Sequence, residues 1–320
     1  MQNKKVHRLV GIGRATQNNE YFSQTLTWGG ETVSAPLPVT LRSSQSDSRY
    51  KYYSINLENT AAVTSVLCDE EIEGVVHLAG ALRDSPFKDL INNNVLATHS
   101  LLSAMESCLQ GGRMILGSSG SVYGNSASIP AVESDRCEPL DKYAVTKLAL
   151  ENLANVSSRQ SGCSLAIARI FNVVGPGLDE RHLASYLARQ FAEQKLIPKP
   201  GKVQVGKLSS TRDFVDVRDV AMGLETLLFS IDKQHGNGVF NLASGTELHV
   251  QYIYDKLAEL SQIKPTSIDM LNSRQLDINR AFANVNRTRT LGFEPIHSIN
   301  SSLHSLFEYY LYLVSQYDNN

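Results

Sequence analysis

The chain has 320 residues, of which 42% are apolar and 19% charged, and its formal net charge is −2. This is the composition of an ordinary globular protein, and it excludes collagen-like and intrinsically disordered chains. The small net charge gives no basic field for a nucleic-acid partner, and no apolar run has the length of a membrane span or the form of a secretory signal, so we expect a cytoplasmic protein. The four cysteines lack metal-ligand spacing, so we expect no metal site. We expect the cysteines to be free thiols.

Short apolar runs alternate along the chain with longer segments in which apolar residues recur at helical spacing. The runs expected to form buried strands are 6–10, 73–79, 113–117 and 164–171. The segments expected to form helices are 86–109, 141–155 and 182–194, and a loop rich in Pro, Gly and Lys is expected over 198–207. This alternation is typical of an α/β fold in which helices cover a parallel sheet. The polar stretch 14–24 and the proline-containing stretch 31–41 predict no clear element.

Tyr143 and Lys147 stand four residues apart in the helix expected over 141–155. This spacing places both side chains on one face of the helix, one turn apart. An ammonium group beside a phenol stabilises the phenolate, which allows a tyrosine to act as general acid or base at neutral pH. The chain has thirteen tyrosines, so such a pair also arises by chance, and its context decides.

A serine-rich turn follows the strand expected over 113–117 and reads SSGSVYG at 118–124. Ligands bind at the carboxyl ends of strands in open parallel sheets, so the hydroxyl groups of this turn are candidate substrate contacts. The alternative interpretation is a polar turn that only caps the next element.

SSGSVYG followed by YAVTK resembles the extended short-chain dehydrogenases/reductases that modify nucleotide sugars. Further similar segments occur in the family's order: HLAG at 77–80, NVLAT at 94–98, RIFNVVGPG at 169–177, RDFVDVRDVA at 212–221, RQLD at 274–277 and LGFEP at 291–295. The resemblance runs from about residue 72 to 310. It implies a Rossmann-like, doubly wound parallel sheet over 1–175, also receiving part of 210–245, and a smaller, mainly substrate-binding region over 176–320.

The resemblance also implies roles for individual residues. Tyr143 would exchange a proton with the C4 oxygen of a hexose, and Ser119 would hydrogen-bond that oxygen. Lys147 would hold the nicotinamide ribose of NADP(H) or NAD(H), and Asn94 would order the proton path. The implied substrate-binding residues are Ser119, Ser121, Asn172, Arg212 and Arg274. The two arginines suit the diphosphate of a sugar nucleotide, because a guanidinium group can donate two hydrogen bonds to phosphate oxygens, although surface ion pairing is the alternative.

The cofactor end of the sequence departs from the family pattern. Members open with a TGxxGxxG turn, whereas this chain reads VGIGRATQ at 10–17, which puts Arg14 in the place of a glycine. Asn56 replaces the family's acidic residue after the third strand. Arg42 lies where the second strand should end and suits a 2′-phosphate, which favours NADP(H), although a solvated arginine fits equally. The implied cofactor-binding residues are Gly11, Gly13, Arg14, Arg42, Asn56, Ala79, Gly80, Tyr143 and Lys147.

The segments similar to family subtypes narrow the reaction. Dehydratases of the family place Asp-Glu after the active-site hydroxyl residue, where this chain has Gly120-Ser121, so dehydration is not expected. The stretch 203–219 is most similar to GDP-4-keto-6-deoxymannose reductases, which makes a 4-keto reductase the first interpretation and a nucleotide-sugar 4-epimerase the second. The altered glycine turn suggests a third, a noncatalytic sugar-nucleotide-binding or interaction protein.

The family commonly forms homodimers through the helix that carries the active-site tyrosine. Leu148, Leu150 and Leu153 of the helix expected over 141–155 would permit such pairing. They equally suit a place in the core of a single chain, and the residues alone do not decide between the two.

Overall fold

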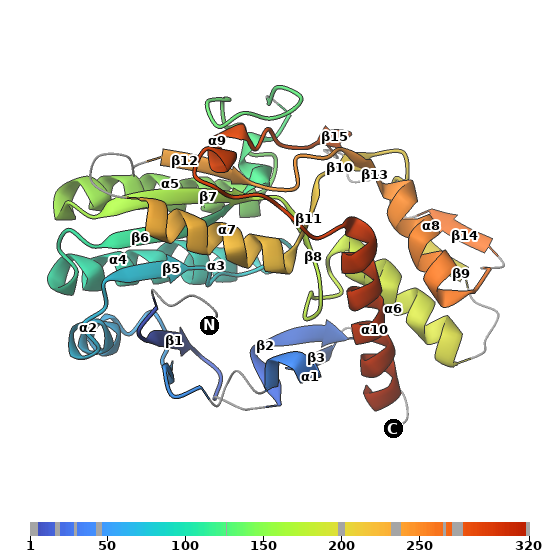
Figure 1. Ribbon diagram of the computed structural model, residues 1–320, viewed down its shortest axis with the longest axis horizontal. Coiled ribbons are helices and arrows are strands. Elements are labelled where there is room, and N and C mark those ends of the chain that lie inside the picture. The colour runs from blue at the N-terminus through green and yellow to red at the C-terminus, as the bar shows by residue number, and fades with distance from the viewer. Residues whose placement is uncertain are drawn as a thin grey trace.

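The computed structural model describes residues 6–16, 20–28, 31–42, 47–125, 127–197, 202–231, 238–264, 267–270 and 278–317. Its centre is a four-stranded, wholly parallel sheet with the order β12-β7-β6-β5 (Figure 1). The strands are β5 (Gly74–His77), β6 (Arg113–Ser119), β7 (Ser164–Ile170) and β12 (Gly238–Leu242). The strands predicted over 73–79, 113–117 and 164–171 are thus confirmed.

Helices cover both faces of this sheet, as the alternation of side chains along β6 shows. Met114 and Leu116 belong to a core shared with one set of helices, whereas Ile115 belongs to a core on the opposite face. The helices of the first face are α2 (Thr60–Asp69), α4 (Ala97–Cys108) and α5 (Lys142–Ser161), and α7 (Val217–Ser230) covers the second. The predicted doubly wound, Rossmann-like sheet is confirmed.

Helix α5 carries the Tyr143–Lys147 pair, and its ends follow from local chemistry. Asp141 accepts a 2.8 Å hydrogen bond from the backbone N–H of Ala144, which caps the amino end. Gly162, with a φ of 68°, ends the helix in the left-handed conformation that glycine adopts easily. Leu150 is fully buried in the core and Leu153 packs against that core.

The segment predicted as one helix over 86–109 is helical throughout its described length, but it contains a wider turn. Its parts are α3 (Phe87–Leu90), the π-helical turn η2 (Ile91–Leu96) and α4. Pro86 lies immediately before the first turn, where the missing N–H of a proline costs nothing. Turns of π type are frequent at functional sites, and this one carries Asn94.

A second hydrophobic core lies beside the sheet and is built largely from the carboxyl-terminal half of the chain. Its elements are α6 (Leu183–Leu196), α8 (Val250–Ser261), α10 (Ile299–Tyr317), and the paired strands β9 (Lys202–Val205) and β14 (Ser267–Met270). The helix predicted over 182–194 is confirmed as α6. The loop predicted over 198–207 is wrong at 202–205, because Val203 and Val205 alternate with exposed residues and are buried in this core.

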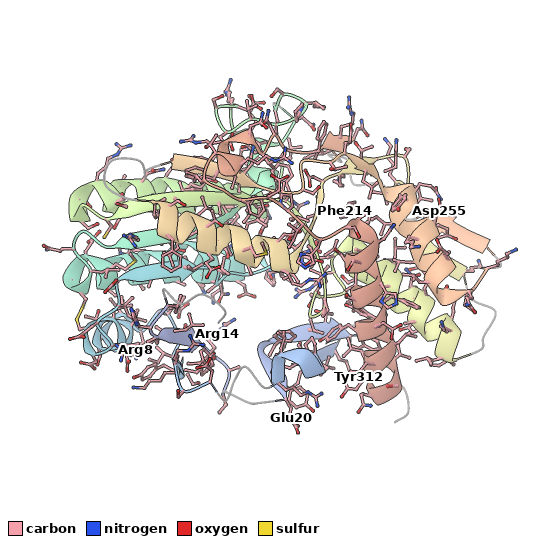
Figure 2. All side chains as sticks on the ribbon, in the orientation of Figure 1. Arg8, Arg14, Glu20, Phe214, Asp255 and Tyr312 are labelled. Carbon is pink, nitrogen blue, oxygen red and sulfur yellow. A yellow bond between two sulfur atoms is a disulfide. The ribbon has the colours of Figure 1, made fainter. Side chains whose placement is uncertain are left out.

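The remaining elements outside the amino-terminal segment are short. They are β8 (Asn172–Val174), β10 (Thr211–Arg212), β11 (Phe214–Asp216), β13 (Leu248–His249), β15 (Arg280–Ala281), the turn η3 (Gly120–Tyr123) and α9 (Asn286–Arg289). Strand β11 pairs in parallel with β8, and β10 lies between β13 and β15. Phe214 is the first residue of β11. Its side chain belongs to the second core, near the start of α10 (Figure 2). Among the described helices, none has both the length and the apolar character of a membrane span.

The amino-terminal segment has an unexpected course. Strand β1 (Leu9–Gly13) pairs in parallel with β4 (Tyr50–Ser54), in a sheet separate from the central one. The opening strand predicted over 6–10 therefore forms, but further along the chain. Between β1 and β4 the chain forms the antiparallel hairpin of β2 (Tyr21–Trp28) and β3 (Glu31–Pro36), followed by the short α1 (Val39–Arg42).

The β2–β3 hairpin packs against the second core rather than against the central sheet. The Trp28 ring stacks on Tyr310 of α10, with 6.1 Å between ring centres and 20° between planes. The backbone N–H of Thr27 donates a 2.8 Å hydrogen bond to Asp179 Oδ2. The amino-terminal segment therefore contributes β1 to the lobe built on the central sheet, and β2 and β3 to the lobe built around the second core (Figure 1).

The prediction of free thiols is wrong for two of the four cysteines. Cys68 of α2 and Cys108 of α4 form a disulfide, with their Cα atoms 5.4 Å apart. They are separated by 40 residues in the sequence, and only the side-by-side packing of the two helices brings them together. Cys137 and Cys163 are free, as predicted.

Candidate active site

Ser119, Tyr143 and Lys147 meet at the carboxyl end of β6. Ser119 is the last residue of this strand, and the other two lie in the first turns of α5, which packs on β6. Lys147 Nζ lies 5.8 Å from the centre of the Tyr143 ring and donates a 2.9 Å hydrogen bond to the carbonyl oxygen of Gly117. Ser121 Oγ donates a 3.0 Å hydrogen bond to Ser119 Oγ, so both predicted serines take part in the cluster.

The phenol of Tyr143 has its pKa raised by burial. The positive charge of Arg83 and a hydrogen bond with Ser119 oppose this rise. The Arg83 guanidinium carbon lies 5.7 Å from the centre of the Tyr143 ring, and its Nε lies 3.2 Å from Asp141 Oδ2. Tyr143 is therefore protonated at neutral pH, which suits a proton donor. Sequence reasoning missed Arg83, because nothing in the loop after HLAG indicates that it lies over the tyrosine.

Lys147 is deeply buried, and burial lowers its pKa to about 8 while the negative charge of Glu151 opposes that shift. Its other neighbour, His77 of β5, is 4% exposed and accepts or donates at Nε2 in a 2.9 Å hydrogen bond with Thr98 Oγ1. Burial, with the charge of Lys147, lowers the pKa of His77 to about 3, so the imidazole is neutral at physiological pH. Of these two neighbours of the ammonium group, Glu151 is therefore an anion and His77 is neutral.

Asn94 has both ends of its side-chain amide occupied within the protein. Its Oδ1 accepts a 2.7 Å hydrogen bond from the backbone N–H of Ala81, and its Nδ2 donates a 2.9 Å hydrogen bond to Thr146 Oγ1. The residue is completely buried. Asn94 therefore links the loop after β5 to Thr146 of α5, three residues after Tyr143 in the same helix.

The loop after β5 presents its backbone to the same cluster. Ala79 and Gly80 are both exposed. A Cβ added to Gly80 would lie 2.8 Å from Asn94 Oδ1 and 3.7 Å from Lys147 Nζ, so a side chain would crowd the cluster. The residues at this end fit the nicotinamide ribose of a dinucleotide, because a hydroxyl, an ammonium group and an open backbone face one another there.

The turn after β1 is built differently from a pyrophosphate cradle. Gly11 and Gly13 lie within β1, and a Cβ on Gly13 would meet the hydroxyl of Tyr52 at 2.5 Å. That hydroxyl donates a 2.8 Å hydrogen bond to the carbonyl oxygen of Ala15. Arg14 is exposed beside the β1–β4 pair (Figure 2). Where the structure describes the chain between β1 and β2, no helix begins, so the amide-rich helix start that usually holds a pyrophosphate is missing there.

The other two residues predicted to contact the adenosine half also lie in this amino-terminal segment. Arg42 ends α1, and its Nε donates a 3.2 Å hydrogen bond to the carbonyl oxygen of Leu37. Asn56 is exposed after β4, and its Nδ2 lies 3.4 Å from Glu58 Oε2. These contacts anchor both residues locally.

The predicted substrate residues Asn172 and Arg212 lie on strands of two different small sheets, β8 and β10. Asn172 begins β8, is exposed, and donates a 2.9 Å hydrogen bond from Nδ2 to the carbonyl oxygen of Asp213. Arg212 is half-buried in β10, immediately before Asp213. The structure therefore brings Asn172 to the backbone of Asp213, the residue after Arg212, whereas Arg274 lies outside the described residues.

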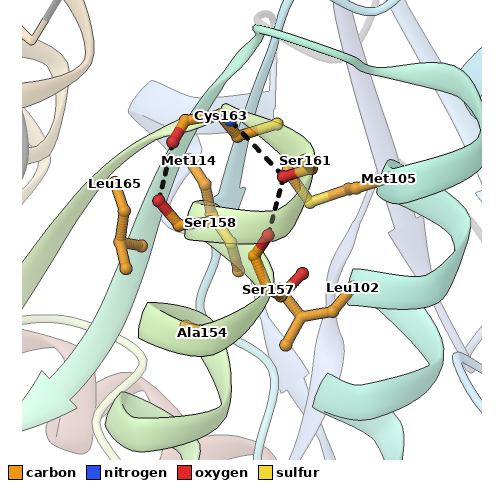
Figure 3. Close-up of a pocket in the computed structure, with 9 residues that line it drawn as sticks. All are labelled: Leu102, Met105, Met114, Ala154, Ser157, Ser158, Ser161, Cys163 and Leu165. Carbon is orange, nitrogen blue, oxygen red and sulfur yellow. Dashed lines mark hydrogen bonds between the residues drawn. The ribbon is translucent and has the colours of Figure 1, made fainter. Parts of the chain in front are cut away.

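A small cavity elsewhere in the sheet domain is lined by Leu102, Met105, Met114, Ala154, Ser157, Ser158, Ser161, Cys163 and Leu165 (Figure 3). It lies near the amino ends of β6 and β7 and the carboxyl end of α5. Ser119 and Tyr143 lie at the opposite ends of these elements. This cavity is therefore a packing gap in the core and not part of the candidate site.

A model of the NAD dependent epimerase/dehydratase family matches residues 2–243 of the chain. The GDP-6-deoxy-D-mannose reductase of Pseudomonas aeruginosa is 32% identical over 244 residues, which are 73% of this chain and 79% of that protein. The match includes the segments that carry Ser119, Tyr143 and Lys147 in this chain.

Solved structures share the fold. RMD from Pseudomonas aeruginosa complexed with NADPH has a TM-score of 0.76 at 27% identity, covering 86% of this chain and 95% of that one. The UDP-glucuronic acid 4-epimerase from Bacillus cereus, in complex with UDP-glucuronic acid and NAD, has a TM-score of 0.77 at 25% identity, covering 96% of this chain and 91% of that one. Likeness in fold alone does not separate these two.

Proposed function

This chain belongs to the NAD dependent epimerase/dehydratase family, and we propose that it reduces a 4-keto-6-deoxy sugar nucleotide at C4 of the hexose. The observation that carries the proposal is the meeting of Ser119, Tyr143 and Lys147 at the carboxyl end of β6. The family's nucleotide-sugar reductases and epimerases are NAD(P)-dependent enzymes. The 32% identity to a GDP-6-deoxy-D-mannose reductase favours reduction over epimerisation.

Each residue of the cluster has a definite task in this reaction. Tyr143, protonated because burial raises its pKa, gives its proton to the C4 oxygen as the ketone becomes an alcohol. Ser119 donates a hydrogen bond to the same oxygen, and Ser121 supports Ser119. When bound, NADP(H) or NAD(H) supplies the hydride chemistry, and Tyr143 and Lys147 would hold its nicotinamide ribose. Arg212 would contact the nucleotide diphosphate, and Asn172 would hold the substrate.

A 4-epimerase is the second candidate, and the likeness to the UDP-glucuronic acid 4-epimerase structure favours it. The two activities differ in whether the nicotinamide is consumed. We expect oxidation of one NADPH per molecule of GDP-4-keto-6-deoxymannose, followed by the absorbance of the reduced nicotinamide. We expect no change when UDP-glucuronate is the substrate. Interconversion of UDP-glucuronate and its C4 epimer without net oxidation, followed by NMR, would instead identify an epimerase.

A noncatalytic sugar-nucleotide-binding protein is a third candidate. It is favoured by the turn after β1, where no helix begins in the described residues to hold a pyrophosphate. Titration with NADPH and NADH, followed by fluorescence of the reduced nicotinamide, separates it from the enzymes. We expect binding of both, with NADPH the tighter because Arg42 suits a 2′-phosphate, and an Arg42→Ala variant in which the difference disappears. Calorimetric binding of GDP-sugar with no binding of either nicotinamide would support the noncatalytic alternative.

A further inference from the structure

One acidic side chain lies inside the sheet domain directly behind the candidate active site. Glu151 follows Lys147 by four residues and Tyr143 by eight, so the three side chains lie along one face of α5. Only 3% of Glu151 is exposed. A buried carboxylate is expected to be paired and hydrogen-bonded, so its partners indicate its role.

The partners of Glu151 come from the two central strands. Arg169 of β7 donates to both carboxylate oxygens, from Nε at 3.1 Å and from Nη2 at 2.9 Å. Ser118 of β6 donates its hydroxyl to Oε1. Arg169 is itself 5% exposed, and its guanidinium carbon lies 4.6 Å from the centre of the Tyr123 ring. The pair is therefore sealed within the core.

Helix α5 and strand β6 are joined at three successive residues of the strand. Lys147 donates to the carbonyl oxygen of Gly117, Glu151 accepts from the hydroxyl of Ser118, and Tyr143 hydrogen-bonds with Ser119. Glu151 is thus the third member of a ladder whose other two members are in the candidate active site. A substitution of Glu151 therefore affects Lys147 in two ways, through their shared contacts with β6 and through the loss of a negative charge.

The titratable groups near Lys147 include Glu151 and Tyr143 on its own helix and the neutral His77 on β5. Arg83, from the loop after β5, lies over the Tyr143 ring, and Arg169 of β7 pairs with Glu151. Strand β6 adds only a carbonyl and a hydroxyl, and η2 adds the neutral Asn94. Glu151 is therefore the anion that favours the ammonium form, and Arg169 partly neutralises it.

We propose that Glu151 is a positioning residue that keeps Lys147 protonated and in place behind Tyr143, and that Arg169 limits how strongly it does so. This inference rests on the proposed function, because the charge of Lys147 affects turnover only if Tyr143 transfers a proton. Because Glu151 and Arg169 form an ion pair, the inference predicts a result that a purely structural role would not give. Removing the anion and removing the cation break the same contact but act on Lys147 with opposite sign.

The test compares Glu151→Gln with Arg169→Gln. In E151Q the pKa of Lys147 falls below its value of about 8, so the alkaline loss of kcat/KM moves to lower pH, by about one unit. In R169Q the uncompensated Glu151 carboxylate raises that pKa, and the loss moves to higher pH. Glu151→Asp keeps the negative charge and is expected to keep the loss near its original pH.

A direct titration does not depend on turnover. Protein with 13C-labelled lysine side chains gives an NMR signal for Lys147, assigned by its absence in Lys147→Arg, and its midpoint is expected to shift downward in E151Q and upward in R169Q. Equal shifts in both variants, or none, would overturn the inference and leave a structural ion pair. If E151Q does not fold, the double variant E151Q/R169Q takes its place, and its midpoint must lie below that of R169Q. Opposite NMR shifts, together with no reductase activity in the unsubstituted protein, would overturn the proposed function alone.

Discussion

Replacing Tyr143 by phenylalanine is expected to lower kcat by about 10²–10⁴-fold, because the variant has no proton to give to the C4 oxygen. The ring remains, so its packing below Arg83 is kept and the fold is retained. Binding of the sugar nucleotide is expected to change little. Steady-state oxidation of NADPH measures kcat, and calorimetry with an unreactive GDP-sugar measures binding.

The control for this loss is Tyr312→Phe, which removes the same hydroxyl from an exposed position on α10. It is expected to leave kcat unchanged. A Y143F enzyme that keeps more than about a tenth of the parent's kcat would show that another group supplies the proton.

Replacing Asp213 by alanine is expected to destabilise the fold by about 3 kcal/mol or more, because one buried and two partly buried backbone N–H groups lose their acceptor. Asp213 is completely buried. Its carboxylate accepts hydrogen bonds from the backbone of Ser244, Gly245 and Ala283 at 2.8, 2.9 and 3.3 Å, and from the Ser244 hydroxyl at 2.7 Å. Urea unfolding measures the loss, which is expected together with a higher KM because Arg212 is adjacent in the chain.

Asp255→Ala is the matched control, since Asp255 is exposed on α8 and accepts a 2.8 Å hydrogen bond from the neighbouring, partly exposed Gln251 (Figure 2). Its effect on the free energy of unfolding is expected to stay within about 0.5 kcal/mol. An equal loss in both variants would contradict the role given to the buried carboxylate.

Three of the four strands of the central sheet, β5, β6 and β7, could be predicted from the sequence because each is a local signal, whereas no strand is predicted at β12. The apolar runs at 113–117 and 164–171 are buried on both faces, and such strands need no knowledge of their partners to be recognised. The pairing of Tyr143 with Lys147 follows equally from helical spacing alone. Local sequence patterns, namely apolar runs and helical spacing, therefore predicted both the fold class and the centre of the candidate site.

What could not be predicted depends on contacts between distant segments. Trp28 is buried against Tyr310 of α10, near the other end of the chain. Cys68 and Cys108 meet because α2 and α4 lie side by side. Arg83 reaches the Tyr143 ring from a loop without regular structure. No periodicity records any of these encounters, so the sequence is silent on them.

The β2–β3 hairpin makes the two lobes interdependent in their stability. Leu26, Trp28 and Ala35 are buried in the carboxyl-terminal core although they precede every strand of the central sheet. A shortened protein that starts at residue 47 would keep all four central strands, yet it would uncover the aromatic side of α10. Its weakest point would then be an exposed apolar surface on α10, far along the chain from the missing residues that cover it, and aggregation would be the consequence.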